Sequence, residues 1–156
     1  MSLPERPALN FADQLQVLYN NPVPIASFTF GIISADQVQR LKALGTYVIG
    51  TANHPLEAKQ WTEIGVDAVC VQGVEAGGHR GGWFPQSKND PMGLLTLISQ
   101  TRACTDIPLI AAGGIMTGQA IKAIQTAGAE LAQIGTAFLT TDKCGINDSY
   151  KQALLD

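Results

Sequence analysis

The segment Pro108-Leu-Ile-Ala-Ala-Gly-Gly-Ile115 is a short apolar run that leads directly into a pair of glycines. A run of this length, bounded by proline and glycine, predicts a strand over 109–112 that is buried on both faces. Gln133-Ile-Gly-Thr136 begins 19 residues after Gly114 and repeats the pattern, a strand that ends in a turn of small residues. Between them, residues 118–127 carry isoleucines at helical spacing. This order of strand, helix and strand predicts a parallel βαβ unit.

The same alternation runs through the rest of the chain. Further strands are predicted at 23–28, 47–51, 68–72 and 131–134. Helices are predicted between them from capping and apolar spacing. Their signals are Asn10 before Phe11, Leu15 and Leu18; the capping box Ser34-Ala-Asp-Gln37; Asn53 and Pro55 before Leu56, Trp61 and Ile64; Pro91 before Leu94, Leu95 and Ile98; and a last segment at 149–155.

The spacing of the strands indicates the type of α/β fold. Successive strands begin about 20 residues apart, a step typical of a (β/α)8 TIM-type barrel, except where a Gly-rich loop follows Gln72. A complete barrel needs roughly 250 residues, and only five strands are predicted. The chain is therefore either a small open α/β domain or an incomplete barrel. Because a helix precedes the first strand, we favour a single domain over residues 1–156 that forms the C-terminal part of a barrel.

Composition excludes several classes of function. The chain is 46% hydrophobic and 15% charged, with a formal charge of −3 and no basic run, so we expect no nucleic-acid partner. No apolar stretch approaches the length of a membrane span, and residues 1–7 lack the apolar core of a secretory leader. Three cysteines without metal-ligand spacing predict reduced thiols, no metal site and a cytoplasmic protein.

The ends of the two last strands predict a phosphate site. Gly113 and Gly114 follow one strand, and Gln133, Ile134, Gly135 and Thr136 form the end of the next. Glycine lets backbone N–H groups approach a phosphate, and the Thr136 hydroxyl can donate to the same oxygens. Phosphate sites at the last two strands recur in barrels. The paired glycines alone could be an ordinary strand–helix turn, so the prediction depends on the second element.

The Gly-rich loop carries the second candidate site. In Val71-Gln-Gly-Val-Glu-Ala-Gly-Gly-His-Arg-Gly-Gly82, Gly77 and Gly78 allow close packing against a flat ring, and the Gln72 amide can meet the polar edge of such a ring. His79 is the candidate catalytic residue, since an imidazole can take a proton or hold an anion at neutral pH; it could also be a plain loop histidine. We expect Glu75 and Arg80 to pair or face solvent, and His54 to be structural.

Three motifs together resemble nitronate monooxygenase, formerly called 2-nitropropane dioxygenase: Gln72-Gly-Val-Glu-Ala-Gly-Gly-His-Arg-Gly81, Ala111-Ala-Gly-Gly-Ile115 and Gln133-Ile-Gly-Thr-Ala-Phe138. The segments Ala26-Ser-Phe-Thr-Phe-Gly31 and Val48-Ile-Gly-Thr51 are also similar to that family. The resemblance covers the chain from about Val23 onward. It implies that Gln72, Gly77, Gly114 and 133–136 contact FMN and that His79 lies near the substrate.

The resemblance also implies an activity, namely an FMN-dependent oxidoreductase that oxidises alkyl nitronates or nitroalkanes with O2 to carbonyl compounds and nitrite. The flavin-dependent enoyl-acyl-carrier-protein reductase shares two of the motifs and is the alternative enzyme. Members of the family are about twice as long as this chain, so a catalytically silent barrel fragment is a further alternative. An open five-stranded piece would expose apolar surface and could form a homo-oligomer.

Overall fold

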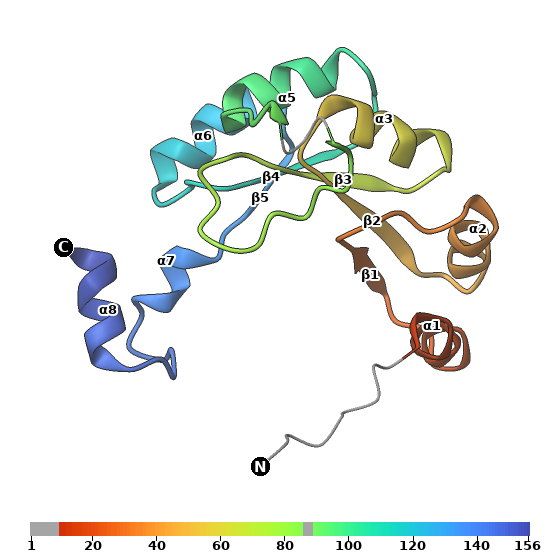
Figure 1. The fold of residues 1–156 in the computed structure, drawn as a ribbon, viewed down its shortest axis with the longest axis horizontal. Helices are drawn as coiled ribbons and strands as arrows, with labels where there is room; N and C mark the ends of the chain where they lie inside the picture. Colours follow the sequence, from red (N-terminus) through yellow and green to blue (C-terminus); the bar gives the residue numbers. More distant parts are fainter. Residues whose placement is uncertain (1–9, 86–88) are drawn as a thin grey trace.

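The computed structural model describes residues 10–85 and 89–156 (Figure 1). The expectation about residues 1–7 lies outside this part of the chain. The strands are β1 (Ile25–Phe28), β2 (Tyr47–Ala52), β3 (Ala68–Gln72), β4 (Leu109–Ala112) and β5 (Leu131–Gln133). The helices are α1 (Phe11–Asn20), α2 (Ala35–Ala43), α3 (Pro55–Glu63), α5 (Leu94–Arg102), α6 (Gly118–Thr126), α7 (Thr136–Leu139) and α8 (Asp148–Leu155).

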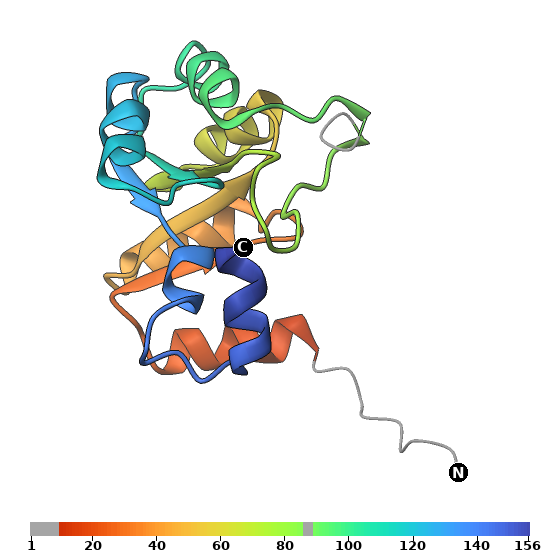
Figure 2. The ribbon, with the colours of Figure 1, turned by 90° about the vertical axis from the view of Figure 1, so that its left-hand side faces the viewer.

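The strands form one parallel sheet in the order β1-β2-β3-β4-β5. Because each strand pairs with the next one along the chain, every crossover moves in the same direction, and right-handed crossovers place their helices on one face. A doubly wound sheet would reverse its strand order and carry helices on both faces. Figures 1 and 2 show α3, α5 and α6 over the same face of the sheet. The described strands and helices therefore form part of a (β/α)8 barrel, as predicted.

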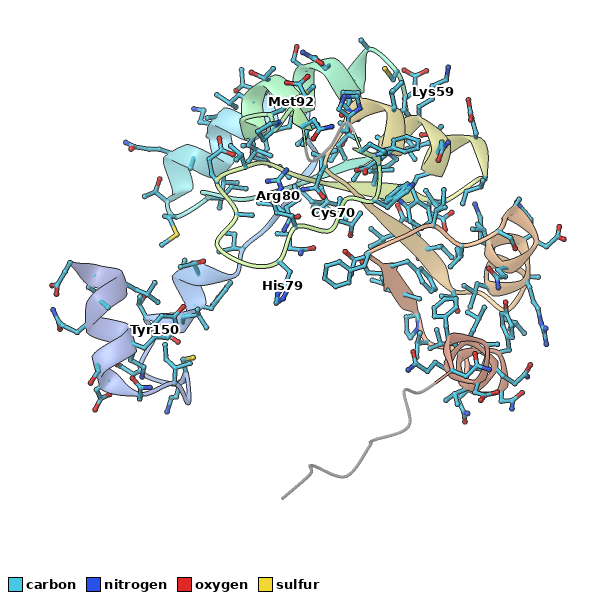
Figure 3. The ribbon with its side chains drawn as sticks, in the orientation of Figure 1. Lys59, Cys70, His79, Arg80, Met92 and Tyr150 are labelled. Atoms are coloured by element: carbon cyan, nitrogen blue, oxygen red, sulfur yellow. The ribbon has the colours of Figure 1, made fainter. Side chains whose placement is uncertain are left out.

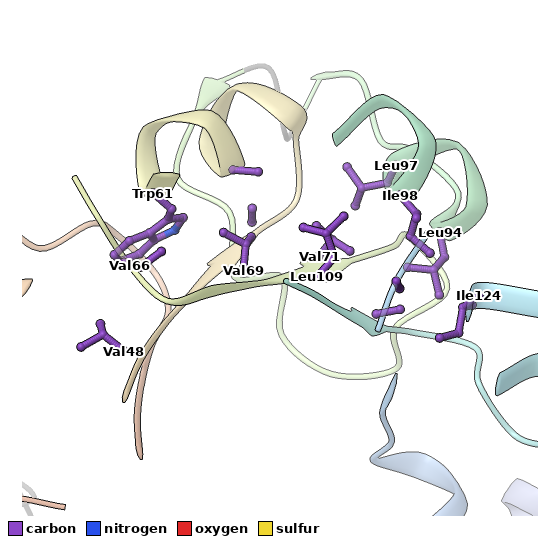
Figure 4. Packing of buried hydrophobic residues seen from close by; sticks show 14 of the residues in the cluster. Val48, Trp61, Val66, Val69, Val71, Leu94, Leu97, Ile98, Leu109 and Ile124 are labelled. Carbon is purple, nitrogen blue, oxygen red and sulfur yellow. The ribbon is translucent and has the colours of Figure 1, made fainter. Parts of the chain in front are cut away.

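The two faces of the sheet differ in burial. Paired residues of neighbouring strands point to the same face, so the row Gly50–Val69–Leu109 faces the helices. This face holds the core shown in Figure 4, where Val69, Val71 and Leu109 pack against Trp61 and side chains of α5. The opposite face carries apolar side chains that stay exposed, namely Ile25 at 60%, Tyr47 at 41% and Leu131 at 59%. The core is thus complete on the helical side only.

Local capping explains where several helices begin. The Asn10 side chain accepts from the Ala12 N–H, and Ser34 and Gln37 form the reciprocal capping box that the sequence predicts. The imidazole of His54 accepts from the Leu56 N–H and caps α3, which confirms its structural role.

Three details of the helices differ from the prediction. Three residues expected on apolar faces, Phe11, Leu56 and Leu95, are exposed at 51%, 46% and 55%. Helix α5 begins at Leu94 rather than Pro91, since Gly93 is its N-cap. The short helix α7 directly after β5 was not predicted. No helix in the described ranges is long and apolar enough to cross a membrane.

Gly50 sits where β2 passes directly beneath α3. A Cβ atom at this position would overlap the ring of Trp61, which is fully buried and donates from Nε1 to the Thr51 carbonyl at 2.9 Å. The glycine therefore lets the indole lie flat against the strand.

Replacing Gly50 with alanine is expected to lower the free energy of unfolding by about 3 kcal/mol, because neither the strand nor the indole can move without losing core packing. Urea unfolding followed by tryptophan fluorescence measures the change. Gly118→Ala is the control, since a Cβ there meets no atom within 4 Å. Equal stability of the two variants would contradict the packing argument.

Candidate active site

All nine residues predicted to hold a cofactor line one cavity of about 220 Å³. The cavity lies at the C-terminal ends of β3, β4 and β5, between the Gly-rich loop and the turns that follow β4 and β5. Its predicted members are Gln72, Gly77, Gly78, Gly113, Gly114, Gln133, Ile134, Gly135 and Thr136; Ala76, Ala112, Ile115 and Met116 complete the described lining.

Glycine geometry keeps the walls of this cavity close together. Gly113 and Gly114 have φ angles of 112° and 66°, in the left-handed region that favours glycine. A Cβ at Gly113 would lie 3.0 Å from the Ala76 nitrogen, and one at Gly77 would lie 3.1 Å from Thr136 Oγ1. The absence of side chains at these positions lets the Gly-rich loop pack against the turns.

The cavity is polar without being charged. None of the described residues that line it is ionisable, and Gln72, Gln133 and Thr136 are its polar side chains. An anionic group held here would rely on backbone N–H groups and a hydroxyl rather than on lysine or arginine. Backbone groups at glycine turns are well suited to phosphate binding.

His79 lines a neighbouring cavity of about 230 Å³ rather than the first one. The two cavities share Gln72, Ala112 and Gln133. The exposed His79 ring stands edge-on to Phe30, with ring centroids 6.1 Å apart. In Figure 3 the His79 side chain points away from the helical layer, toward the open side of the sheet. A molecule beside His79 would therefore be next to a group bound in the first cavity.

The Gln72 amide clamps the Gly-rich loop on both sides of Arg80. Its Oε1 accepts from Asn53 Nδ2 and from the Gly81 N–H, and its Nε2 donates to the His79 carbonyl, each at 2.9 Å. Asn53 Nδ2 also donates to the Gln72 carbonyl at 2.9 Å. The side chain that the sequence assigned to a ring edge thus also positions the backbone of His79.

Glu57 fixes the other end of the loop and was missed by the sequence analysis. Its side chain is fully buried on α3. Oε1 accepts from the Trp83 and Phe84 N–H groups at 2.7 Å, and Oε2 accepts from the Asn53 N–H at 2.6 Å. Three short bonds to a carboxylate offset the cost of burying it. Helical periodicity carries no signal for such a residue, because two of its three partners lie in a distant loop.

Glu75 and Arg80 do not pair with each other in the described residues. The Glu75 carboxylate accepts from the Leu94 N–H at 2.9 and 3.0 Å and so caps α5, where Gly93 has no side chain. Arg80 Nη1 donates to the Gly73 carbonyl at 3.1 Å, and the side chain lies between the loop and the sheet (Figure 3). The expectation that these residues pair or face solvent was therefore incomplete. The Glu75 carboxylate binds the backbone N–H of Leu94, and the Arg80 guanidinium binds the backbone carbonyl of Gly73.

Cys70 lies on the face of the sheet that points away from the helices, which we call the inner face. It also lines the His79 cavity. Its Sγ donates to Gln133 Oε1 at 3.5 Å, and burial raises the pKa of the thiol to about 12. All three cysteines are free, as predicted, although Cys104 is exposed and Cys144 half-buried. Cys70 is thus a neutral thiol at physiological pH, unsuited to nucleophilic chemistry.

Known proteins resemble this chain in sequence and architecture. The family model described as nitronate monooxygenase matches residues 3–156. The chain belongs to the nitronate monooxygenase family.

Individual relatives agree with this assignment. A probable nitronate monooxygenase from Staphylococcus haemolyticus is 40% identical over 97% of this chain and 44% of its own length. The structure of nitroalkane oxidase from Streptomyces ansochromogenes has a TM-score of 0.87 and 45% identity, over 94% of this chain and 43% of that one. FabK from Thermotoga maritima has a TM-score of 0.76 and 30% identity, over 90% and 42%. The chain thus spans less than half the length of these relatives.

Glu57→Gln is expected to destabilise the fold by about 2 kcal/mol, because glutamine has one acceptor oxygen: the Asn53 N–H then faces the amide NH2 group, and the bonds from Trp83 and Phe84 weaken because their acceptor is no longer charged. The amides of Trp83 and Phe84 should exchange with solvent deuterium faster than in the wild type. Glu63→Gln on the same helix is the control, since Glu63 forms only an exposed pair with Lys59 at 3.9 Å and should change stability by less than about 0.5 kcal/mol. Unchanged exchange in Glu57→Gln would show that the carboxylate does not hold the loop.

The buried Cys70 thiol should make the free energy of unfolding depend on pH in the alkaline range. Its folded pKa of about 12 lies above the ordinary value of 9.0, so its contribution is complete below pH 9 and is lost as pH rises toward 12. Wild-type stability should therefore fall more steeply than that of Cys70→Ala over this range, measured by urea unfolding at several pH values. Parallel slopes for the two proteins would refute the assignment.

Proposed function

We propose that this chain provides the phosphate-binding turns and the histidine of an FMN-dependent nitronate monooxygenase, as one domain over residues 1–156. The reaction would oxidise alkyl nitronates or nitroalkanes with O2 to carbonyl compounds and nitrite. The observation that carries the proposal is that nine residues from three separate motifs line one cavity, which adjoins the cavity of His79. Membership of the nitronate monooxygenase family supports it.

The residues of the first cavity fit an FMN molecule. Gly113, Gly114 and the Gly135–Thr136 turn would receive the phosphate, because left-handed glycines leave the backbone open to close approach. Gly77 and Gly78 would pack against the ring system, with Gln72 and Gln133 at its edge. When bound, the flavin supplies the redox chemistry, while the protein supplies orientation and electrostatics.

His79 would act on the substrate from the second cavity. Its exposed imidazole can accept the proton of a nitroalkane carbon or, when protonated, hold the anionic nitronate. The bond from Gln72 Nε2 to the His79 carbonyl limits where the imidazole can reach, and the Phe30 ring borders it on one side.

The partners of the proposed site are a small nitro compound and O2, and we place the enzyme in the cytoplasm. The exposed inner face of the sheet is the surface through which we propose self-association.

The cofactor proposal predicts that titration with FMN quenches flavin fluorescence. Gly114→Val should weaken FMN binding at least about tenfold, because a branched side chain there meets Glu75 Cβ and is strained by the positive φ angle. Gly118→Ala, which lies outside the cavity, should bind as the wild type does. A wild-type protein that leaves flavin fluorescence unchanged would contradict the proposal for this chain and favour the silent fragment.

The activity proposal predicts nitronate-dependent oxygen uptake in the presence of FMN. With a neutral nitroalkane as substrate, His79→Ala should lower the rate at least about 100-fold, because the acceptor for the carbon-bound proton is lost, without changing FMN affinity. His54→Asn is the control, since asparagine also caps helices. Equal rates for the two variants would remove His79 from the mechanism. Nicotinamide-dependent reduction of an enoyl thioester, without oxygen uptake, would favour the reductase alternative.

A further inference from the structure

A third cavity, of about 220 Å³, lies beside the His79 cavity and differs from it in chemistry. Its described lining is apolar apart from Thr29 and contains no ionisable group; the side chains of Phe11, Phe28, Ile32 and Ile33 form most of it. The His79 cavity shares Thr29 and Phe30 with it. We propose that this cavity is a subsite for the apolar substituent of the substrate, an inference that rests on the function proposed above.

Phe30 forms the border between the two cavities and has an unusual backbone. Its φ angle of 65° is the only positive value at a non-glycine residue in the described chain, and its ring is 63% exposed. A bulky residue in this region is strained, and such strain concentrates at ligand sites. The Phe30 N–H donates to the Gly81 carbonyl at 3.1 Å. That bond ties the residue to the loop that carries His79.

The same clamp therefore positions both the imidazole and the ring. Gln72 Oε1 holds the Gly81 N–H, and the Gly81 carbonyl holds Phe30. A Cβ at Gly81 would meet Thr29 and Thr51 side chains, so only glycine lets the loop approach β1 and β2 this closely. The relative position of the His79 and Phe30 backbones is consequently set by the Gln72 amide together with the backbone bond between Phe30 and Gly81.

The position of the third cavity beside the His79 cavity defines the class of substrate. An anionic head beside His79 and an apolar tail that passes Phe30 require a molecule with one charged end and a hydrocarbon chain. Nitronates of short nitroalkanes would occupy the His79 cavity alone, whereas longer chains would also bury carbon in the third cavity. Each CH2 group that enters should raise affinity about fourfold.

The test compares the affinities of nitronate anions made from nitroethane, 1-nitrobutane and 1-nitrohexane. Isothermal titration calorimetry under nitrogen, on the chain loaded with reduced FMN, measures binding without turnover. The wild type should bind the hexyl anion at least about tenfold more tightly than the ethyl anion. Phe11→Ala, which opens a wall of the third cavity only, should remove most of this preference and leave ethyl binding within twofold. Phe30→Ala should remove the preference as well.

Val17→Ala is the matched control, because Val17 is an exposed apolar residue of the same helix, 59% exposed, that lines none of the three cavities. It should keep the wild-type preference. Affinity independent of chain length, or Phe11→Ala weakening all three anions equally, would overturn the subsite. Length-dependent binding without oxygen uptake would refute the proposed function and leave the subsite standing. Failure of every anion to bind would contradict both.

Discussion

The candidate site depends on a buried carboxylate that accepts three backbone N–H groups. Glu57 has no exposed surface, yet its oxygens are bonded to the end of β2 through Asn53 and to the far end of the Gly-rich loop through Trp83 and Phe84. The loop has little regular secondary structure of its own, so its path is determined by side chains of its neighbours. A charged acceptor suits this purpose, because bonds to an ionised group are shorter and stronger than those between neutral groups.

From Glu57 a series of hydrogen bonds reaches the proposed chemistry. The carboxylate holds the Asn53 backbone, the Asn53 amide holds Gln72, and Gln72 holds the loop on both sides of Arg80. The bonds among Glu57, Asn53, Gln72 and Gly81 are buried or half-buried, so their donors and acceptors cannot readily exchange with water, whereas the bond from Gln72 to the His79 carbonyl is exposed. His79 is exposed, but the backbone that carries it is held from both sides. The imidazole is therefore accessible to a substrate while the backbone that carries it has a defined position. A histidine on a glycine loop without such bonds would not have a defined position.

Much of the fold and of the first cavity was predictable, because both follow from local patterns. Buried parallel strands are short apolar runs, and the ends of such strands meet on one edge of the sheet, which is why residues as far apart as Gly77 and Gly135 line one cavity. Helix α3 shows where this reasoning fails. Periodicity placed Leu56 inside, whereas Leu56 is exposed and Glu57 buried. The loop residues that bond to the Glu57 carboxylate, Trp83 and Phe84, lie 26 and 27 residues later in the chain. The positive φ angle of Phe30 likewise depends on a bond to Gly81 that no local pattern announces.

The two faces of the sheet explain how a site can form on part of a barrel. Side chains of the outer face, such as Val69 and Leu109, have no exposed surface, because α3 and α5 cover them. The ends of β3 and β4 are therefore held in place by the core between the sheet and these helices. The inner face differs, since Ile25, Tyr47 and Leu131 remain exposed and the relatives are more than twice as long. The cavity geometry should accordingly depend on the outer core and on the Glu57 bonds. Covering the inner face would instead change how far water reaches His79 and Cys70, and with it the strength of electrostatic interactions in the cavity they share.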